Sequence, residues 1–130
     1  MATIKSYSDL QQSKKLAEFL PLESADMWWN IELDDDNEID GYTPSFYPEP
    51  LSDSDIPCWS LAALLDIIPQ EIFDGEYIIN ITEGCDKRWV LTYDHYENRN
   101  HSYYGLSSGA DNLIDACVEM IIKLHELKML

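Results

Sequence analysis

Residues 76–106 read EYIINITEGCDKRWVLTYDHYENRNHSYYGL, and this stretch decides the fold prediction. Apolar and aromatic runs at 76–82, 87–93 and 101–106 are separated by polar turns. In the second run Trp89 and Leu91 alternate with other residues, which is the period of a strand with one buried face. The short connections favour antiparallel pairing, because parallel strands need a long crossover. The stretch predicts a meander of three antiparallel strands.

Helical patterns flank the predicted strands. Residues 59–68 place apolar side chains at i, i+3, i+4 and i+7, with Ser60 as the expected cap. Residues 110–127 carry a broader apolar stripe, typical of a helix laid across a sheet. Residues 9–20 form a third pattern, with Ser8 and a glutamine three residues later at capping-box spacing. The predicted class is α+β, with helices packed on one face of a small, about three-stranded, antiparallel sheet.

The length of 130 residues predicts a single globular domain over 1–130. A hydrophobic content of 45% supports a folded core despite the high charge. A weak helical pattern occurs at 23–29. Residues 30–57 are acidic and contain prolines interleaved with aromatics, which predicts a long ordered loop that packs on the core.

The acidic residues are concentrated in one segment. Between Leu16 and Asp86 there is no lysine or arginine, and this stretch holds 18 of the 25 acidic residues of a chain whose net charge is −17. Such a surface repels nucleic acids and anionic membranes and attracts basic groups. The expected partner is the basic surface of another protein, with no direct nucleic-acid binding and no membrane contact.

Cysteine usage and the N-terminus indicate the compartment. Cys58, Cys85 and Cys117 form no CxxC pair, so they resemble neither a disulfide framework nor a zinc set. The first residues lack the apolar core of a signal peptide, and no apolar run approaches the length of a bilayer span. These features predict a cytoplasmic protein with reduced thiols.

One acidic stretch resembles a calcium site. Asp36, Glu38, Asp40 and Gly41 copy the first half of an EF-hand loop, in which alternating carboxylates converge and glycine permits a sharp turn. The twelfth position is Tyr47, where the loop needs a bidentate glutamate. We therefore expect a solvated acidic loop, with no metal and no cofactor.

Other chemistry-bearing residues favour structural roles. His95, Glu97 and His101 surround one predicted turn, where metal binding or acid–base chemistry would require convergence that the spacing does not ensure. An aromatic set on the predicted sheet fits core packing better than base stacking, because stacking platforms lie in positive grooves. This set consists of Trp89, Tyr93, Tyr103 and Tyr104. With no nucleophile elbow, P-loop or GxGxxG motif, the chain is not expected to be an enzyme.

Two adjacent tryptophans precede the acidic cluster and are the strongest candidates for a binding surface, since exposed tryptophans often mark one. The alternative is that both pack beneath the proline-rich loop. The predicted binding set joins the tryptophans to the acids that follow them: Trp28, Trp29, Asp34, Asp35, Asp36, Glu38 and Asp40.

Three segments together match a known pattern. They are residues 12–16 (QSKKL), 56–65 (IPCWSLAALL) and 114–127 (IDACVEMIIKLHEL). On these segments the chain resembles a family of small uncharacterised proteins from phages, prophages and mobile elements of gut anaerobes. Its members share an I-P-x-W-S-L-x-A-L-L block and a C-terminal D-A-x-x-E-M helix. The resemblance implies a phage or mobile-element context and leaves the activity open.

The expected function is that of a non-catalytic accessory protein that binds a host or element-encoded protein through its acidic face. One version is a counter-defence inhibitor, such as an anti-restriction or anti-CRISPR protein, that imitates the charge of DNA. The alternative is a protein that binds or sequesters a nucleotide-like small molecule beneath Trp28 and Trp29. Its phosphates would need Lys87, Arg88 or Arg99. The sequence leaves the oligomeric state open.

Overall fold

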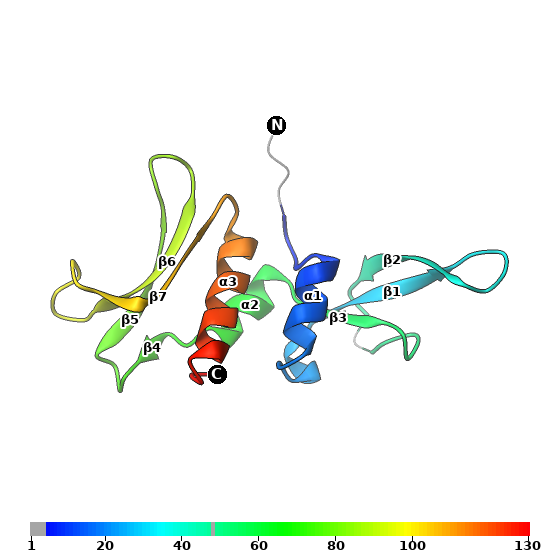
Figure 1. The fold of residues 1–130 in the computed structure, drawn as a ribbon, viewed down its shortest axis with the longest axis horizontal. Coiled ribbons are helices and arrows are strands. Elements are labelled where there is room, and N and C mark those ends of the chain that lie inside the picture. Colours follow the sequence, from blue (N-terminus) through cyan, green and yellow to red (C-terminus); the bar gives the residue numbers. More distant parts are fainter. Residues whose placement is uncertain (1–4, 48) are drawn as a thin grey trace. The chain divides into compact units, whose positions relative to one another are not determined.

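The computed structural model describes residues 5–47 and 49–130. Over these residues the chain forms three α-helices and two antiparallel sheets, which confirms the α+β class (Figure 1). Contacts divide it into an N-terminal unit of residues 6–63 and a C-terminal unit of residues 64–130 that also includes Lys5. The expectation of a single domain stays a prediction.

The N-terminal unit combines one helix with a three-stranded sheet. Helix α1 spans Leu10–Ala17 and is followed by a single 3₁₀ turn, η1, at Leu22–Ser24. The strands are β1 (Met27–Leu33), β2 (Ile39–Ser45) and β3 (Ile56–Cys58), in the order β2-β1-β3 and all antiparallel. Helix α1 packs beside β3 (Figure 1).

The prediction of one continuous loop at about 30–57 is therefore wrong, because the end of β1, all of β2 and the start of β3 lie within it. Pro44 lies within β2 and Pro57 within β3. Both are edge strands, where a residue without an N–H group is tolerated. The helical pattern at 23–29 is also mostly wrong, since only Leu22–Ser24 is helical and both tryptophans lie in β1.

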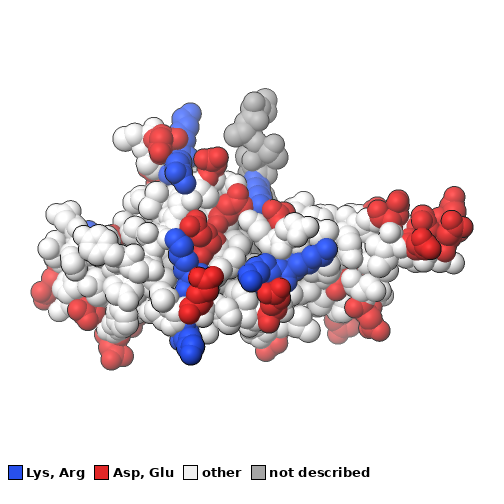
Figure 2. All heavy atoms as spheres, viewed as in Figure 1, with Lys and Arg blue, Asp and Glu red and all other residues white. Residues whose placement is uncertain are grey.

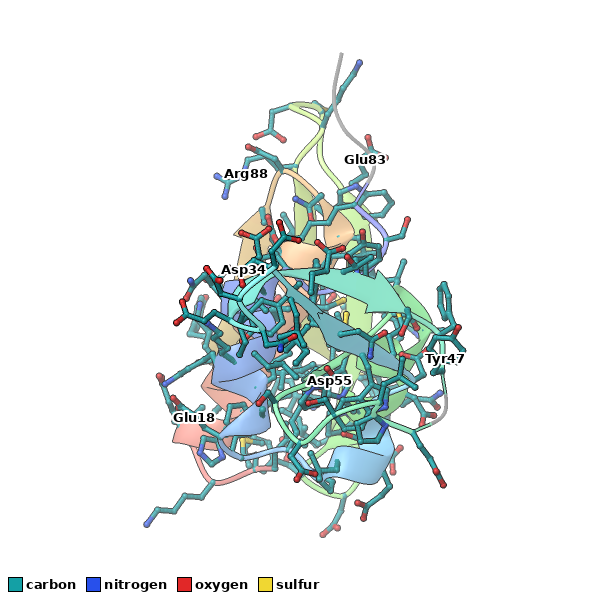
Figure 3. All side chains as sticks on the ribbon, turned by 90° about the vertical axis from the view of Figure 1, so that its right-hand side faces the viewer. Glu18, Asp34, Tyr47, Asp55, Glu83 and Arg88 are labelled. Carbon is teal, nitrogen blue, oxygen red and sulfur yellow. The ribbon has the colours of Figure 1, made fainter. Side chains whose placement is uncertain are left out.

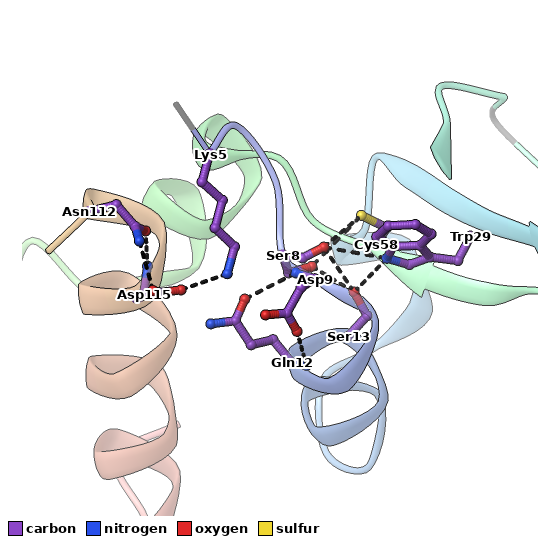
Figure 4. A network of polar contacts seen from close by, with 9 residues as sticks. All are labelled: Lys5, Ser8, Asp9, Gln12, Ser13, Trp29, Cys58, Asn112 and Asp115. Atoms are coloured by element: carbon purple, nitrogen blue, oxygen red, sulfur yellow. Dashed lines mark hydrogen bonds and ion pairs between the residues drawn. The ribbon is translucent and has the colours of Figure 1, made fainter. Parts of the chain in front are cut away.

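The cap of α1 is Asp9, one residue later than predicted. The Asp9 carboxylate accepts a hydrogen bond from the Gln12 N–H at 2.8 Å, and the Gln12 side chain accepts one from the Asp9 N–H at 3.0 Å. Ser8 is buried instead and pairs with Trp59 through two hydrogen bonds of 2.8 and 3.1 Å. The network around Ser8 in Figure 4 therefore belongs to the core of this unit.

The C-terminal unit contains the predicted meander. Strands β5 (Tyr77–Glu83), β6 (Trp89–His95) and β7 (Ser102–Ala110) pair in sequence order, antiparallel throughout. A short strand, β4 (Glu71–Ile72), adds a fourth member that the sequence did not predict.

Two helices complete this part of the chain. Helix α2 (Leu61–Ile67) begins in the N-terminal unit and ends in the C-terminal unit, with the Ser60 hydroxyl accepting from the Ala63 N–H at 3.2 Å as expected of a cap. Helix α3 (Leu113–Glu126) packs on β6 and β7. Asn112 caps α3, and Lys5 forms a 2.7 Å ion pair with Asp115 in its first turn (Figure 4).

The β1–β2 and β5–β6 hairpins close with the same turn. In each, an N–H at the first turn position donates to the carbonyl four residues later, and the N–H three residues later donates back. The fourth residue has a positive φ, 61° at Asn37 and 63° at Lys87. This geometry is a three-residue hairpin loop whose last residue is left-handed, a conformation that asparagine accepts more readily than lysine.

The core of the C-terminal unit lies between α3 and the sheet. Leu91, Tyr93 and Leu106 from the strands are fully buried, as are Cys117 and Ile121 of α3. Burial raises the pKa of both Tyr93 and Cys117 to about 12. The Tyr93 hydroxyl donates to the Pro69 carbonyl at 2.6 Å, so this core leaves the phenol satisfied. Among the described residues, no helix has both the length and the apolar character needed to cross a membrane.

The two apolar helix faces can be tested with adjacent pairs of residues. Leu64→Ala and Ile121→Ala should each lower the free energy of unfolding by about 2–5 kcal/mol, because both side chains are completely buried. Leu65→Ala and Ile122→Ala are the matched controls, since these neighbours are partly exposed. Urea denaturation of the four variants measures the difference. Equal losses within a pair would show that the helix face is assigned wrongly.

Candidate functional site

The predicted acids lie together at the turn of the β1–β2 hairpin, and all are exposed. We name this group the acidic hairpin turn; it comprises Asp34, Asp35, Asp36, Glu38 and Asp40. In Figure 2 the carboxylates gather at this turn, whereas the basic side chains seen on the same unit lie over α1. Five of the 18 acidic residues of the segment without lysine or arginine thus lie at one hairpin end.

The acidic hairpin turn is held by its own hydrogen bonds. The Asp34 N–H donates to the Glu38 carbonyl at 2.9 Å, and the Asn37 N–H donates to the Asp34 carbonyl at 3.0 Å. One carboxylate oxygen of Asp34 accepts from the N–H groups of Asp36 and Glu38, at 2.9 and 3.0 Å. Asp40 occupies the register shift where β2 has one more residue than β1. The carboxylates therefore stand on a fixed backbone.

The two tryptophans lie at the other end of the same hairpin. Trp28 pairs with Ser45 and Trp29 with Pro44, near the last residues of β2, whereas the acids surround the turn. The structure therefore does not gather the predicted binding set into one cluster. Alternation along β1 also places the two indoles on opposite faces of the sheet.

Trp29 packs against α1. Its indole N–H lies within hydrogen-bond distance of the Ser13 hydroxyl, at 3.1 Å, and of the Ser8 carbonyl, at 3.3 Å (Figure 4). Its ring meets Tyr7 edge to face, with centroids 5.7 Å apart. Both tryptophans are half-buried. Trp29 thus fastens the hairpin to the helix, which is a structural use of a residue that the sequence marked as a binding candidate.

Asp55 is the residue of this unit that sequence reasoning missed. It is buried, and its carboxylate accepts four hydrogen bonds: from the Ile31 N–H at 2.9 Å, the Asn30 amide at 2.8 Å, the Leu51 N–H at 2.8 Å and the Ser52 N–H at 3.1 Å. Figure 3 shows it apart from Asp34 at the turn. Nothing in the run Ser52 to Asp55 distinguishes this acid from its exposed neighbours.

The charge of Asp55 is stabilised by these donors. Burial by itself raises the pKa of the carboxyl, but the hydrogen bonds from Ile31, Asn30, Leu51 and Ser52 outweigh it, and the pKa lies below its ordinary value. The carboxylate joins β1 to the segment that leads into β3. It supports the hairpin and does not contribute to its exposed charge.

The other candidate residues separate into buried and exposed positions. Tyr93 is buried, Tyr104 is 90% exposed, and the rings of His95 and His101 are 6.4 Å apart. In the described part of the chain, no group of three or more His, Cys, Asp or Glu side chains is arranged to hold a metal ion. The predicted aromatic set therefore does not form a single platform.

The three cysteines are free thiols in different surroundings. Cys58 and Cys117 are buried, and Cys85 is exposed. Burial raises the pKa of the Cys58 thiol, although hydrogen bonds with Ser8 and Ser13 oppose that effect. A thiol with a raised pKa carries little of the reactive thiolate form, so the two buried cysteines act as core side chains.

Comparison with protein-family models, with curated proteins and with solved structures finds no match to this chain.

The role of Asp55 predicts a specific pH dependence. Asp55→Asn should lower the free energy of unfolding by about 1–3 kcal/mol at neutral pH, because an amide nitrogen would face backbone N–H groups. Since the folded-state pKa is lower than the unfolded one, the stabilisation is present above the unfolded value of about 3.9 and is lost as the pH falls through the folded value. Urea unfolding should show a gap between variant and parent that is constant above about pH 5 and narrows below about pH 4.

The control for this experiment is Asp53→Asn, which removes an exposed carboxylate two residues away. It should leave the unfolding curves close to those of the parent at every pH. An Asp55→Asn gap that stays the same in acid would contradict the assignment, because the loss would then come from shape and not from charge.

Proposed function

We propose that this chain is a non-catalytic accessory protein that binds the basic surface of a protein partner through the acidic hairpin turn. The observation that carries the proposal is the exposure of five carboxylates on one hydrogen-bonded hairpin end, within a segment that has no lysine or arginine. Such a concentration of one sign accelerates association with a surface of the opposite sign.

Three features of the turn support binding over simple solubility. The backbone is fixed by hydrogen bonds, so less conformational freedom is lost when a partner docks. The hairpin is fastened to α1 by Trp29 and to the segment before β3 by Asp55. The acids are adjacent, whereas solubility alone would be served as well by scattered charge.

The proposed context is a phage or mobile element acting in the host cytoplasm, as the sequence resemblance implies. There the acidic hairpin turn would occupy a site that normally receives the phosphates of a nucleic acid, as in a counter-defence inhibitor. Duplex DNA presents about one negative charge per 1.7 Å of helix axis, so a competitor for its site needs closely spaced carboxylates.

The alternative of a nucleotide-like ligand beneath both tryptophans has less support. Trp29 already uses its indole N–H on Ser8 and Ser13 and its ring on Tyr7. The two indoles also face opposite sides of the sheet, so they do not enclose one ligand.

The proposal is tested by comparing two variants of equal net charge. The hairpin variant replaces the five acids of the acidic hairpin turn with Asn or Gln. The control variant makes the same replacement at five exposed acids elsewhere: Glu18, Glu23, Glu49, Asp53 and Asp66. The protein captured by the tagged parent from the native host is the partner for rate measurements at several salt concentrations.

The hairpin variant should associate at least tenfold more slowly than the control, with a smaller change in dissociation rate, because the charge acts mainly on encounter. The difference should shrink as salt shortens the screening length from about 10 Å at 0.1 M to about 3 Å at 1 M. Equal association rates for the two variants would show that the acidic hairpin turn is not part of the interface.

A further inference from the structure

Seven aromatic rings of the C-terminal unit contact one another in a continuous chain at one end of its sheet. We name this group the aromatic surface; it consists of Phe73, Tyr77, His95, Tyr96, His101, Tyr103 and Tyr104. Tyr77 is central, with its ring 5.5 Å from His95 and 5.7 Å from Tyr103. The aromatic surface shares no residue with the acidic hairpin turn, which belongs to the other unit.

Strand register and one turn bring these rings together. Tyr77 of β5 is directly opposite His95 of β6, and the His95 N–H donates to the His101 carbonyl at 2.8 Å. Phe73 lies in the β4–β5 turn, and the centroid of its ring is 5.1 Å from that of Tyr103. The rings come from four separate parts of the chain, which is why the sequence did not predict that they form one group.

The outer rings remain open to solvent. Tyr104 is 90% exposed, Tyr96 51% and Phe73 48%. Contiguous exposed aromatic groups are uncommon on proteins without a partner, and they mark interaction surfaces. A single exposed ring is common on protein surfaces, but a group of exposed rings in contact with one another is not.

The backbone at Phe73 is a second, independent sign of function. Phe73 has a φ of 53° and Asp74 a φ of 55°, both in the left-handed region, followed by Gly75 at 88°. A bulky side chain is rarely found in this region, because it is strained there. Because Phe73 is about half exposed, burial offsets only part of that strain, and its ring completes the aromatic surface.

The charges beside the rings indicate which kind of ligand this surface favours. The segments 71–77 and 95–104 hold four exposed carboxylates and one exposed base, Arg99. Glu76 lies 3.9 Å from the Nε2 atom of His95, and the Glu71 carboxylate lies over Gly75 in the turn. Negative groups around aromatic faces favour cations, which are attracted to the ring faces, and repel phosphates.

We propose that the aromatic surface binds arginine or lysine side chains of a basic peptide segment in a protein partner. The guanidinium or ammonium group would lie on an exposed tyrosine or phenylalanine ring while the neighbouring carboxylates neutralise its charge. Nucleic-acid bases fit less well, because base-stacking platforms lie in positive grooves. The proposal goes beyond the acidic hairpin turn and does not depend on it.

The test uses a synthetic hexa-arginine peptide and the full chain in 0.5 M salt, where screening over roughly 4 Å suppresses attraction to distant carboxylates. Chemical shifts of the aromatic rings, followed by NMR during titration, give both the site and the affinity. Shifts should concentrate on the aromatic surface, and they should persist in the hairpin variant described above. A parallel titration with a ten-nucleotide thymidine strand should leave the rings unchanged.

The decisive variant is Phe73→Gly combined with Tyr104→Ser. Glycine accepts the positive φ at position 73, and Tyr104 is almost fully exposed, so the variant should remain folded, which its melting curve checks. It should bind hexa-arginine at least tenfold more weakly. The matched control is Phe46→Ser, which removes a 74% exposed ring from the N-terminal unit and should bind like the parent.

Three results would overturn the proposal: shifts confined to the acidic hairpin turn, unchanged affinity in the double variant, or binding of the thymidine strand to the rings. Failure of the acidic hairpin turn in the rate experiment would leave this titration unaffected. The two proposals therefore stand or fall separately.

Discussion

Asp55 lies where the pairing of β3 with β1 ends, and its two oxygens accept hydrogen bonds from four donors. Strand β3 is only three residues long, so its ladder ends at the pairing of Trp29 with Ile56. The carboxylate then takes the place of the next ladder acceptor by binding the Ile31 N–H. A buried charge is stable there because four donors satisfy it, and removing one of them would leave the ion with too few hydrogen bonds. Together with the contact of Trp29 with α1, this contact holds the β1–β2 hairpin that carries the exposed acids.

The sequence predicted most elements of the C-terminal unit correctly, because the hydrophobic pattern of this unit is simple. Trp89, Leu91 and Tyr93 alternate, the turns are polar, and α3 carries a broad apolar stripe, so local preference and burial agree. The N-terminal sheet escaped prediction because two signals conflicted. Pro44 and Pro57 indicate a loop by composition, yet both occupy edge strands, where a missing N–H group is tolerated. Whether a strand lies at the edge of a sheet depends on the tertiary structure, so it cannot be predicted from a short stretch of sequence.

The candidate sites show the same division between what is local and what is not. Exposure of the acids could be predicted, because adjacent carboxylates remain in water whatever the fold. The packing of Trp29 could not be predicted, since it depends on the position of Ser13 in α1. Ser8 shows how much one residue matters. It was predicted to cap α1, but the cap is Asp9, and Ser8 is buried in the core. The aromatic surface is the extreme case, because its rings meet through strand register and the β4–β5 turn.

The two hairpin turns make the acidity of the first one informative. The turn that starts at Gly84 has the same two backbone hydrogen bonds and the same left-handed fourth residue as the turn that starts at Asp34, fifty positions earlier. Where the first has Asn37 and Glu38, the second has Lys87 and Arg88. The backbone of this turn is therefore indifferent to the sign of the charge that it carries. Neither the left-handed φ of the fourth residue nor the two backbone hydrogen bonds require an acid at position 38, so the geometry of the turn does not explain the glutamate there.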